Sequence, residues 1–165
     1  MTELDPLTEP LVHLFLRLDA ATPSDPVLRA AAEYWTEQRQ GKIMPAPGDM
    51  EQLPAFILPH VFQAQLAING DRHWLVSMAG SSAALPLGIT GKTPAEIADK
   101  RMAVRLRRLF DLVSEKAEPY SVMFEVPGLD GHKHLFEVYA APLATPERAE
   151  HQILAVINSR VEGHR

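Results

Sequence analysis

The chain has 165 residues, of which 46% are hydrophobic and 22% are charged, which is ordinary usage for one globular domain. It contains no Cys, so disulfides, thiolate metal sites and cysteine nucleophiles are excluded. The formal net charge is -5, whereas nucleic-acid-binding proteins usually carry an excess of basic residues, so we expect no nucleic-acid partner.

Residues 1–22 predict a short N-terminal helical extension. Their acidic start differs from a secretory signal, and the apolar run at 11–18 is too short to cross a bilayer. We therefore expect a cytoplasmic protein with no membrane partner. Four apolar residues at helical spacing form one stripe: Leu11, Leu14, Phe15 and Leu18. This stripe either packs on the domain's own core or contacts another chain, which makes the four residues candidate partner contacts.

Residues 23–162 are expected to form the main domain, which opens with a helix. Ser24 or Asp25 can cap the first free amide groups, and Pro26 suits the first helical turn. We expect this helix to run to about Gln40. The proline-rich segment 41–59 then predicts a connection with little regular structure.

A β-hairpin is predicted after His60. Apolar residues alternate along 61–68 and again along 74–79, and Asn69-Gly70-Asp71 between them is typical of a tight turn. A capping box at 93–96 then predicts a helical region that reaches about Lys116. Its buried stripe is expected to contain Met102, Leu106, Leu109 and Val113.

Three strands are predicted to close the chain, at 120–126, 134–140 and 153–157. The last of them is apolar on both faces, which is typical of a central strand. Five antiparallel strands interrupted by helices indicate an α+β domain.

Four segments resemble a bacterial PAS-like family of small stand-alone proteins: Tyr34–Pro45, Leu53–His60, Val76–Gly80 and Leu87–Lys92. The resemblance covers roughly residues 30–160. It implies a five-stranded antiparallel sheet in the order 2-1-5-4-3 with helices on one face. It also implies a role in signalling, by small-molecule sensing, by protein contact, or by both. The family usually has an Arg and a Gly-Thr pair at the end of the second strand, whereas this chain keeps Gly80 without the Arg.

Two side-chain pairs are candidate chemical sites. His132 and His134 alternate on one face and could share a metal, but no third ligand is near in sequence, so a surface pair is favoured. Glu125 and Glu137 could act as an acid and base pair, but alternation places them opposite the neighbouring aromatic residues. We therefore predict no catalytic residue and no metal site.

A basic stripe of Arg101, Arg105 and Arg108 lies on one face of the predicted 93–116 helix. It would either meet an acidic partner or phosphate or form a solvated face, and the solvated face is favoured.

A ligand cavity between the sheet and the helices is the remaining candidate site, although an aromatic-rich face is normally core. Its expected lining is Phe62, Trp74, Val76, Leu106, Phe110, Phe124, Phe136 and Val138. The cofactor is unknown, and haem and flavin are disfavoured because no Cys is available for a flavin adduct and no single His is placed as an axial ligand.

The sequence therefore favours a stand-alone PAS-type sensory or regulatory module that is not an enzyme. It would act through contact with another signalling protein or as a homodimer, with a small molecule as a further candidate partner. The alternative is a small α+β enzyme of the isomerase or dehydratase kind that uses a carboxylate base.

Overall fold

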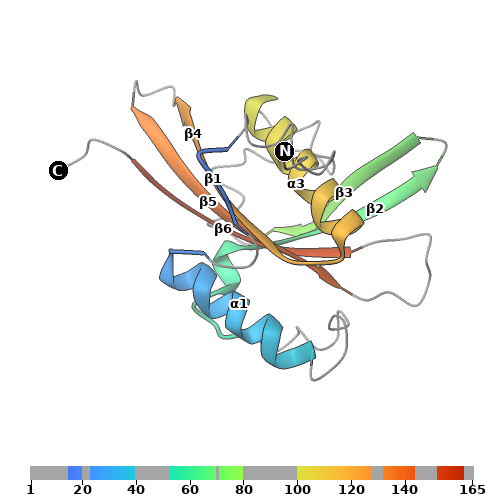
Figure 1. Cartoon of the computed structure of the whole chain (residues 1–165), viewed down its shortest axis with the longest axis horizontal. Coiled ribbons are helices and arrows are strands. Elements are labelled where there is room, and N and C mark those ends of the chain that lie inside the picture. The colour runs from blue at the N-terminus through green and yellow to red at the C-terminus, as the bar shows by residue number, and fades with distance from the viewer. Residues whose placement is uncertain are drawn as a thin grey trace, which may run out of the picture.

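The computed structural model describes residues 15–19, 23–39, 53–69, 71–79, 100–127, 132–143 and 152–161. Within these residues the chain forms strands, two α-helices and a short 3-10 helix (Figure 1). Their bounds are β1 Arg17–Asp19, α1 Pro26–Arg39, η3 Leu58–His60, β2 Val61–Asn69, β3 Asp71–Ala79, α3 Lys100–Lys116, β4 Tyr120–Pro127, β5 Lys133–Leu143 and β6 Gln152–Val161. This confirms an α+β domain.

The strands form one antiparallel sheet in the order β1-β4-β5-β6-β2-β3. If β1 is left out and β2 to β6 are renumbered 1 to 5 in chain order, the sheet read from β3 has the order 2-1-5-4-3. The expected sheet of five strands differs from this one by the sixth strand, β1, which pairs with the edge of β4 through Arg17 opposite Met123. The strand β6 lies inside the sheet between β5 and β2, as its two apolar faces predicted.

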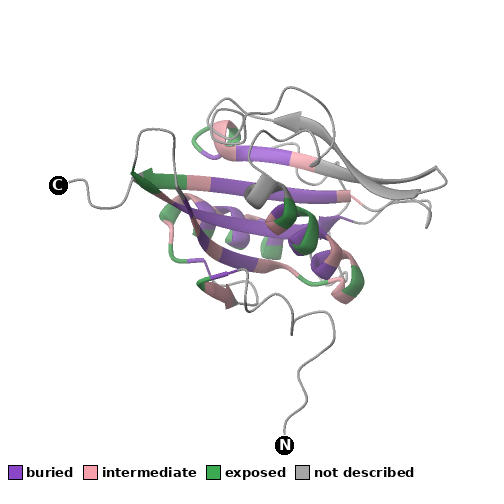
Figure 2. Ribbon diagram, turned by 90° about the horizontal axis from the view of Figure 1, so that it is seen from above, coloured by how far each residue is buried: buried purple, intermediate pink, exposed green. Residues whose placement is uncertain are grey.

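The expected arrangement of helices on one face is wrong, because α1 and α3 cover opposite faces of the sheet (Figure 1). Alternate residues of β5 explain this. Phe136 and Val138 pack with α3, whereas Tyr139 and Ala141 pack with α1. A strand that is apolar on both faces needs cover on both, and Figure 2 shows buried residues running through the central strands.

The N-terminal segment differs from the predicted helix where the structure describes it. Arg17–Asp19 is the strand β1, and Leu16 donates its backbone N–H to the Met123 carbonyl at 2.8 Å. Phe15 is buried in the core beneath α3, and Leu18 packs against that core. Pairing with β4 supplies backbone hydrogen bonds that a three-residue segment cannot form within itself. The division of the chain at residue 22 stays a prediction.

Local hydrogen bonds define the start of α1 and the end of α3. Asp25 caps α1, since its Oδ1 accepts hydrogen bonds from the backbone N–H groups of Val27 and Leu28. The helix α3 ends at Lys116, and Ala117 follows with a positive φ of 53° while its N–H reaches the Val113 carbonyl. Such a left-handed residue satisfies a terminal carbonyl of the helix. The expected start of this helix at residue 93 lies outside the described residues.

The predicted hairpin is confirmed as β2 and β3, with Asn69 opposite Asp71. A register shift between Gln63 and Ala64 marks a bulge in β2. Bulges increase local twist, which here occurs where β2 also pairs with β6.

Candidate functional site

In the described part of the chain, the buried charged side chain is Glu137 of β5, whose carboxylate-bearing side chain is only 7% exposed. It lies on the face covered by α1, and it accepts hydrogen bonds from the segment that precedes the helix. The Ser24 backbone N–H reaches Oε2 at 2.7 Å, and the Asp25 backbone N–H reaches Oε1 at 2.9 Å. The Ser24 hydroxyl is shared between the two oxygens at 3.2 and 3.1 Å. A buried carboxylate is tolerated only with such donors.

Asp25 extends this network to a third element. Its Oδ1 caps α1, and its Oδ2 accepts a hydrogen bond from the Asn158 side-chain amide of β6 at 2.8 Å. Asn158 in turn accepts the Ser159 N–H through Oδ1 at 2.9 Å. We call the set Ser24, Asp25, Glu137 and Asn158 the α1 lock, because it joins the start of α1 to two neighbouring strands of the sheet.

A small half-open cavity of about 50 Å³ adjoins the α1 lock. Its lining contains two carboxylates, an arginine, two other polar residues and two apolar residues. These are Asp25, Met123, Leu135, Glu137, Asn158, Ser159 and Arg160. The opening leaves one side of the lock uncovered by protein. Sequence reasoning did not find this cavity, because its lining residues come from four separate segments.

Six of the eight expected ligand-lining residues belong to the core on the opposite face, where α3 packs on the sheet. Those with described side chains are buried in one core: Phe62, Leu106, Phe110, Phe124, Phe136 and Val138. The side chains of Trp74 and Val76 lie outside the described residues. Phe124 and Phe136 stack with ring centroids 5.5 Å apart, and Phe62 lies 5.8 Å from Phe110. These contacts are those of a packed core, and the binding of a ligand among them stays a prediction.

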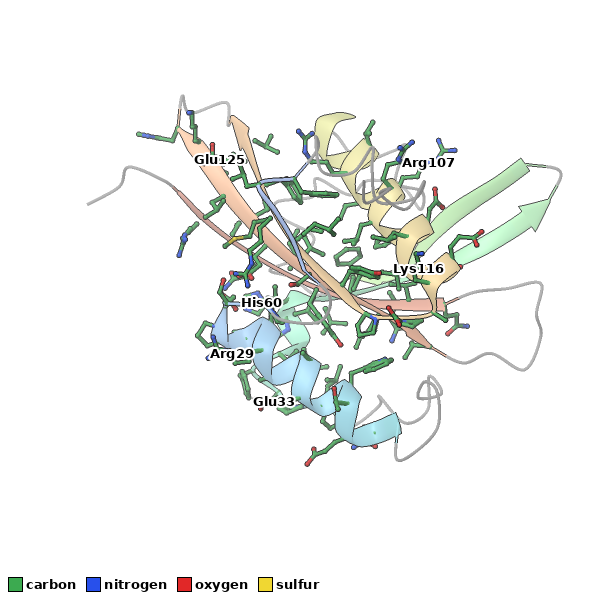
Figure 3. All side chains as sticks on the ribbon, viewed as in Figure 1. Arg29, Glu33, His60, Arg107, Lys116 and Glu125 are labelled. Atoms are coloured by element: carbon green, nitrogen blue, oxygen red, sulfur yellow. The ribbon has the colours of Figure 1, made fainter. Side chains whose placement is uncertain are left out.

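The basic stripe of α3 is only partly solvated. The Arg105 guanidinium lies 5.7 Å from the centroid of the Phe124 ring and is half-buried, so it contributes to packing. Arg108 is exposed, as is Arg107 on the outer side of α3 (Figure 3). The Arg101 side chain lies outside the described residues.

The two expected carboxylates do not meet in one pocket. Glu137 is buried in the α1 lock, whereas Glu125 is half-buried and lies toward the end of β4 that is distant from α1 (Figure 3). His132 is exposed, and the half-buried His134 ring lies 6.4 Å from Phe136. Across the described ranges, no group of three or more His, Cys, Asp or Glu side chains could hold a metal ion.

The structure places two of the four candidate partner contacts against the chain's own core, and contact of any of the four with another chain stays a prediction. Phe15 and Leu18 pack on the chain's own core, and the Phe15 ring lies 5.9 Å from Phe124. Leu11 and Leu14 lie outside the described residues. The exposed large apolar side chains in the described part of the chain are instead Leu16, Phe56, Leu58 and Val104.

Comparison with known proteins gives little support for any assignment. No protein-family model and no curated protein matches the chain. Among solved structures, the chain is similar to an RNA-binding light-oxygen-voltage receptor at 13% identity and a TM-score of 0.41. The match covers 86% of this chain and 37% of the receptor chain. A likeness this distant assigns neither a family nor an activity.

No helix in the segments that the structure describes is long and apolar enough to cross a membrane.

Proposed function

We propose that the chain is a PAS-type regulatory module that acts through contact with another protein. The observation that carries the proposal is the strand order. The strands β2 to β6 follow 2-1-5-4-3, the order that the sequence resemblance implies, and α3 connects the second and third of them. Order and connection together constrain the fold more strongly than the short sequence matches do.

The contact surface is proposed to lie on the α1 side of the sheet. Exposed apolar residues gather there beside buried ones: Phe56 is 57% exposed and Leu58 is 44% exposed, while Ile57 between them is buried against α1. Exposed aromatic and aliphatic side chains next to a rigid core are common at protein contacts.

A small molecule held between α3 and the sheet is the second part of the proposal. It is supported by the number of aromatic side chains that meet beneath α3, including Phe62, Phe110 and Phe124. Binding there requires the packed rings to separate, so the ligand must be largely apolar and must stabilise an opened form of this core.

Native mass spectrometry of the protein purified from its own source tests both parts. A bound compound that is released on denaturation supports the ligand, and a complex with a second protein or copy supports the contact. A clean monomer mass at all tested concentrations, with no co-purifying molecule, contradicts both parts.

A carboxylate-dependent enzyme is the second candidate, because Glu137 is buried and lines the cavity. Three donors already occupy its oxygens, and Glu125 is not part of the cavity lining. A general base must reach a substrate proton with a free lone pair. A panel of isomerase and dehydratase substrates, compared between the natural chain and Glu137→Gln, tests this candidate. Turnover that the substitution abolishes would replace the regulatory proposal.

A further inference from the structure

We propose that the Phe15 side chain fills a binding slot for one aromatic ring, and that an apolar aromatic compound enters the slot by displacing it. We call the place that this side chain occupies beside Phe124 the Phe15 slot. The inference deepens the ligand part of the proposed function, on which its purpose rests. It names the point of entry, the residue that closes it and the class of compound.

Phe15 is held by a shorter element than the other described rings that are buried beneath α3. Those rings belong to elements of 8 to 17 residues, namely Phe62 of β2, Phe110 of α3, Phe124 of β4 and Phe136 of β5. Phe15 instead stands just before β1, which has three residues. Short segments at the edge of a sheet open more readily than core strands and long helices. Displacement of Phe15 therefore disturbs the least structure.

The contact between Phe15 and Phe124 can be reproduced by a free ring. The two ring centroids lie 5.9 Å apart and the ring planes are tilted by 58°, which is a favourable arrangement for aromatic groups. Phe124 is held independently of Phe15, because it stacks on Phe136 at 5.5 Å and has the Arg105 guanidinium 5.7 Å from its centroid. The wall of the slot therefore stays in place without Phe15, and a compound with one aromatic ring can take the same position.

The slot lies at the margin of the core. Phe15 is 8% exposed and its neighbour Leu16 is 65% exposed, whereas Phe110 and Phe124 are at most 1% exposed. A small compound can therefore reach the slot from this margin, without separation of α3 from the sheet.

The segment that carries Phe15 is attached along one edge. β1 pairs with β4 on one side, and in the described part of the chain no strand pairs with its other side. The Leu16 N–H also donates to the Met123 carbonyl at 2.8 Å. Burial of a phenylalanine ring stabilises a docked segment more than any single hydrogen bond of this kind. A compound that fills the slot takes over this contribution and shifts the chain toward the form in which β1 is released.

Displacement of Phe15 connects the core with the edge of the sheet. When β1 is released, β4 loses the partner that pairs with it from Arg17 opposite Met123 to Asp19 opposite Ser121. Occupancy of the slot by a ligand thereby changes the edge of the sheet, which is the kind of step that a sensory module requires.

Toluene binding to the full chain, measured by isothermal titration calorimetry, tests the slot. Phe15→Ala leaves the slot vacant, because truncated cores relax only partially and a dry apolar cavity accepts such a ring. We expect this variant to bind toluene at least about tenfold more tightly than the natural chain, since the ligand no longer competes with a buried phenyl group. The matched control is Phe56→Ala, which removes an exposed phenyl group outside this core and should bind toluene as the natural chain does.

Hydrogen exchange of the natural chain, followed by mass spectrometry, tests the displacement. At a toluene concentration about ten times the dissociation constant of Phe15→Ala, the population with β1 released should rise about tenfold. The amides of Leu16 to Asp19 should exchange faster by a similar factor, while those of β5 and β6 keep their rates. If Phe15→Ala does not fold, a toluene titration of the natural chain replaces it, and exchange in β1 should then rise with the toluene concentration.

Two results overturn the inference. One is equal affinity of Phe15→Ala and the natural chain for toluene, and the other is exchange in β1 that toluene does not change. Neither contradicts the proposed function, because a ligand could still lie elsewhere beneath α3. A natural chain that carries no co-purifying molecule and forms no complex contradicts the proposed function instead, and the toluene measurements still decide whether the slot exists.

Discussion

Substitution of Asp25 by Ala should destabilise the domain through two separable losses. The first is the cap of α1, because Oδ1 accepts from Val27 and Leu28, and such caps are worth about 1 kcal/mol. The second is the 2.8 Å hydrogen bond from Asn158 to a carboxylate, worth about 1.5 kcal/mol at this half-buried site. We therefore expect Asp25→Ala to lower the free energy of unfolding by about 2.5 kcal/mol.

Urea unfolding followed by tryptophan fluorescence provides the assay, since Trp35 is buried on α1 beside the sheet. The control is Asp25→Ser, because Ser caps helices as well as Asp does but is too short to reach Asn158. It should lose only about 1.5 kcal/mol. A double-mutant cycle of Asp25→Ala with Asn158→Ala should give a coupling energy of about 1.5 kcal/mol. A coupling near zero would refute the assignment of this contact as a link between α1 and β6.

Three further predictions concern other parts of the fold. Trp35→Phe leaves the buried Pro142 carbonyl without its donor, so calorimetry should show a loss of about 2 kcal/mol, and an unchanged stability would contradict that contact. Phe124→Ala removes a buried ring that stacks in the core, so chemical denaturation should show a loss of about 3–5 kcal/mol, whereas a loss below about 1 kcal/mol would mean that the core beneath α3 is loosely packed. Burial and the nearby Glu118 carboxylate raise the pKa of Tyr120 above 10.0, so an ultraviolet titration should show a late tyrosine transition that Tyr120→Phe removes. Because the folded chain holds this proton to higher pH than the unfolded chain, stability should fall as pH rises through 10, less so in Tyr120→Phe.

The strands and helices of the main domain were predictable because their signals are local. Alternation identified β4, β5 and β6, and the Ser24-Asp25-Pro26 run located the start of α1. The two apolar faces of β6 also indicated cover on both sides of the sheet, a consequence that the family resemblance obscured. The placement of helices on one face was therefore wrong although the residues carried the correct information.

The N-terminal strand illustrates what local patterns cannot decide. Arg17, Leu18 and Asp19 alternate polar and apolar residues, so the same letters suit a short strand and the edge of a helical stripe. The choice is made by β4, about 100 residues later in the chain, where Val122 faces Leu18 across the pair. Contacts at such separation leave no trace in a short window of sequence.

The role of Glu137 was hidden for a related reason. Alternation placed it correctly on the face opposite Phe136, where a glutamate is usually read as a solvated residue. The structure instead places the start of α1 over that position, so the side chain is buried and meets two backbone donors. A buried acid in a central strand is costly unless its donors are supplied, and here they come from the two residues that lead into α1, which covers this face. The stability of the sheet face and the position of α1 therefore depend on the same carboxylate. A change at Glu137 should for this reason affect α1 before it affects the sheet.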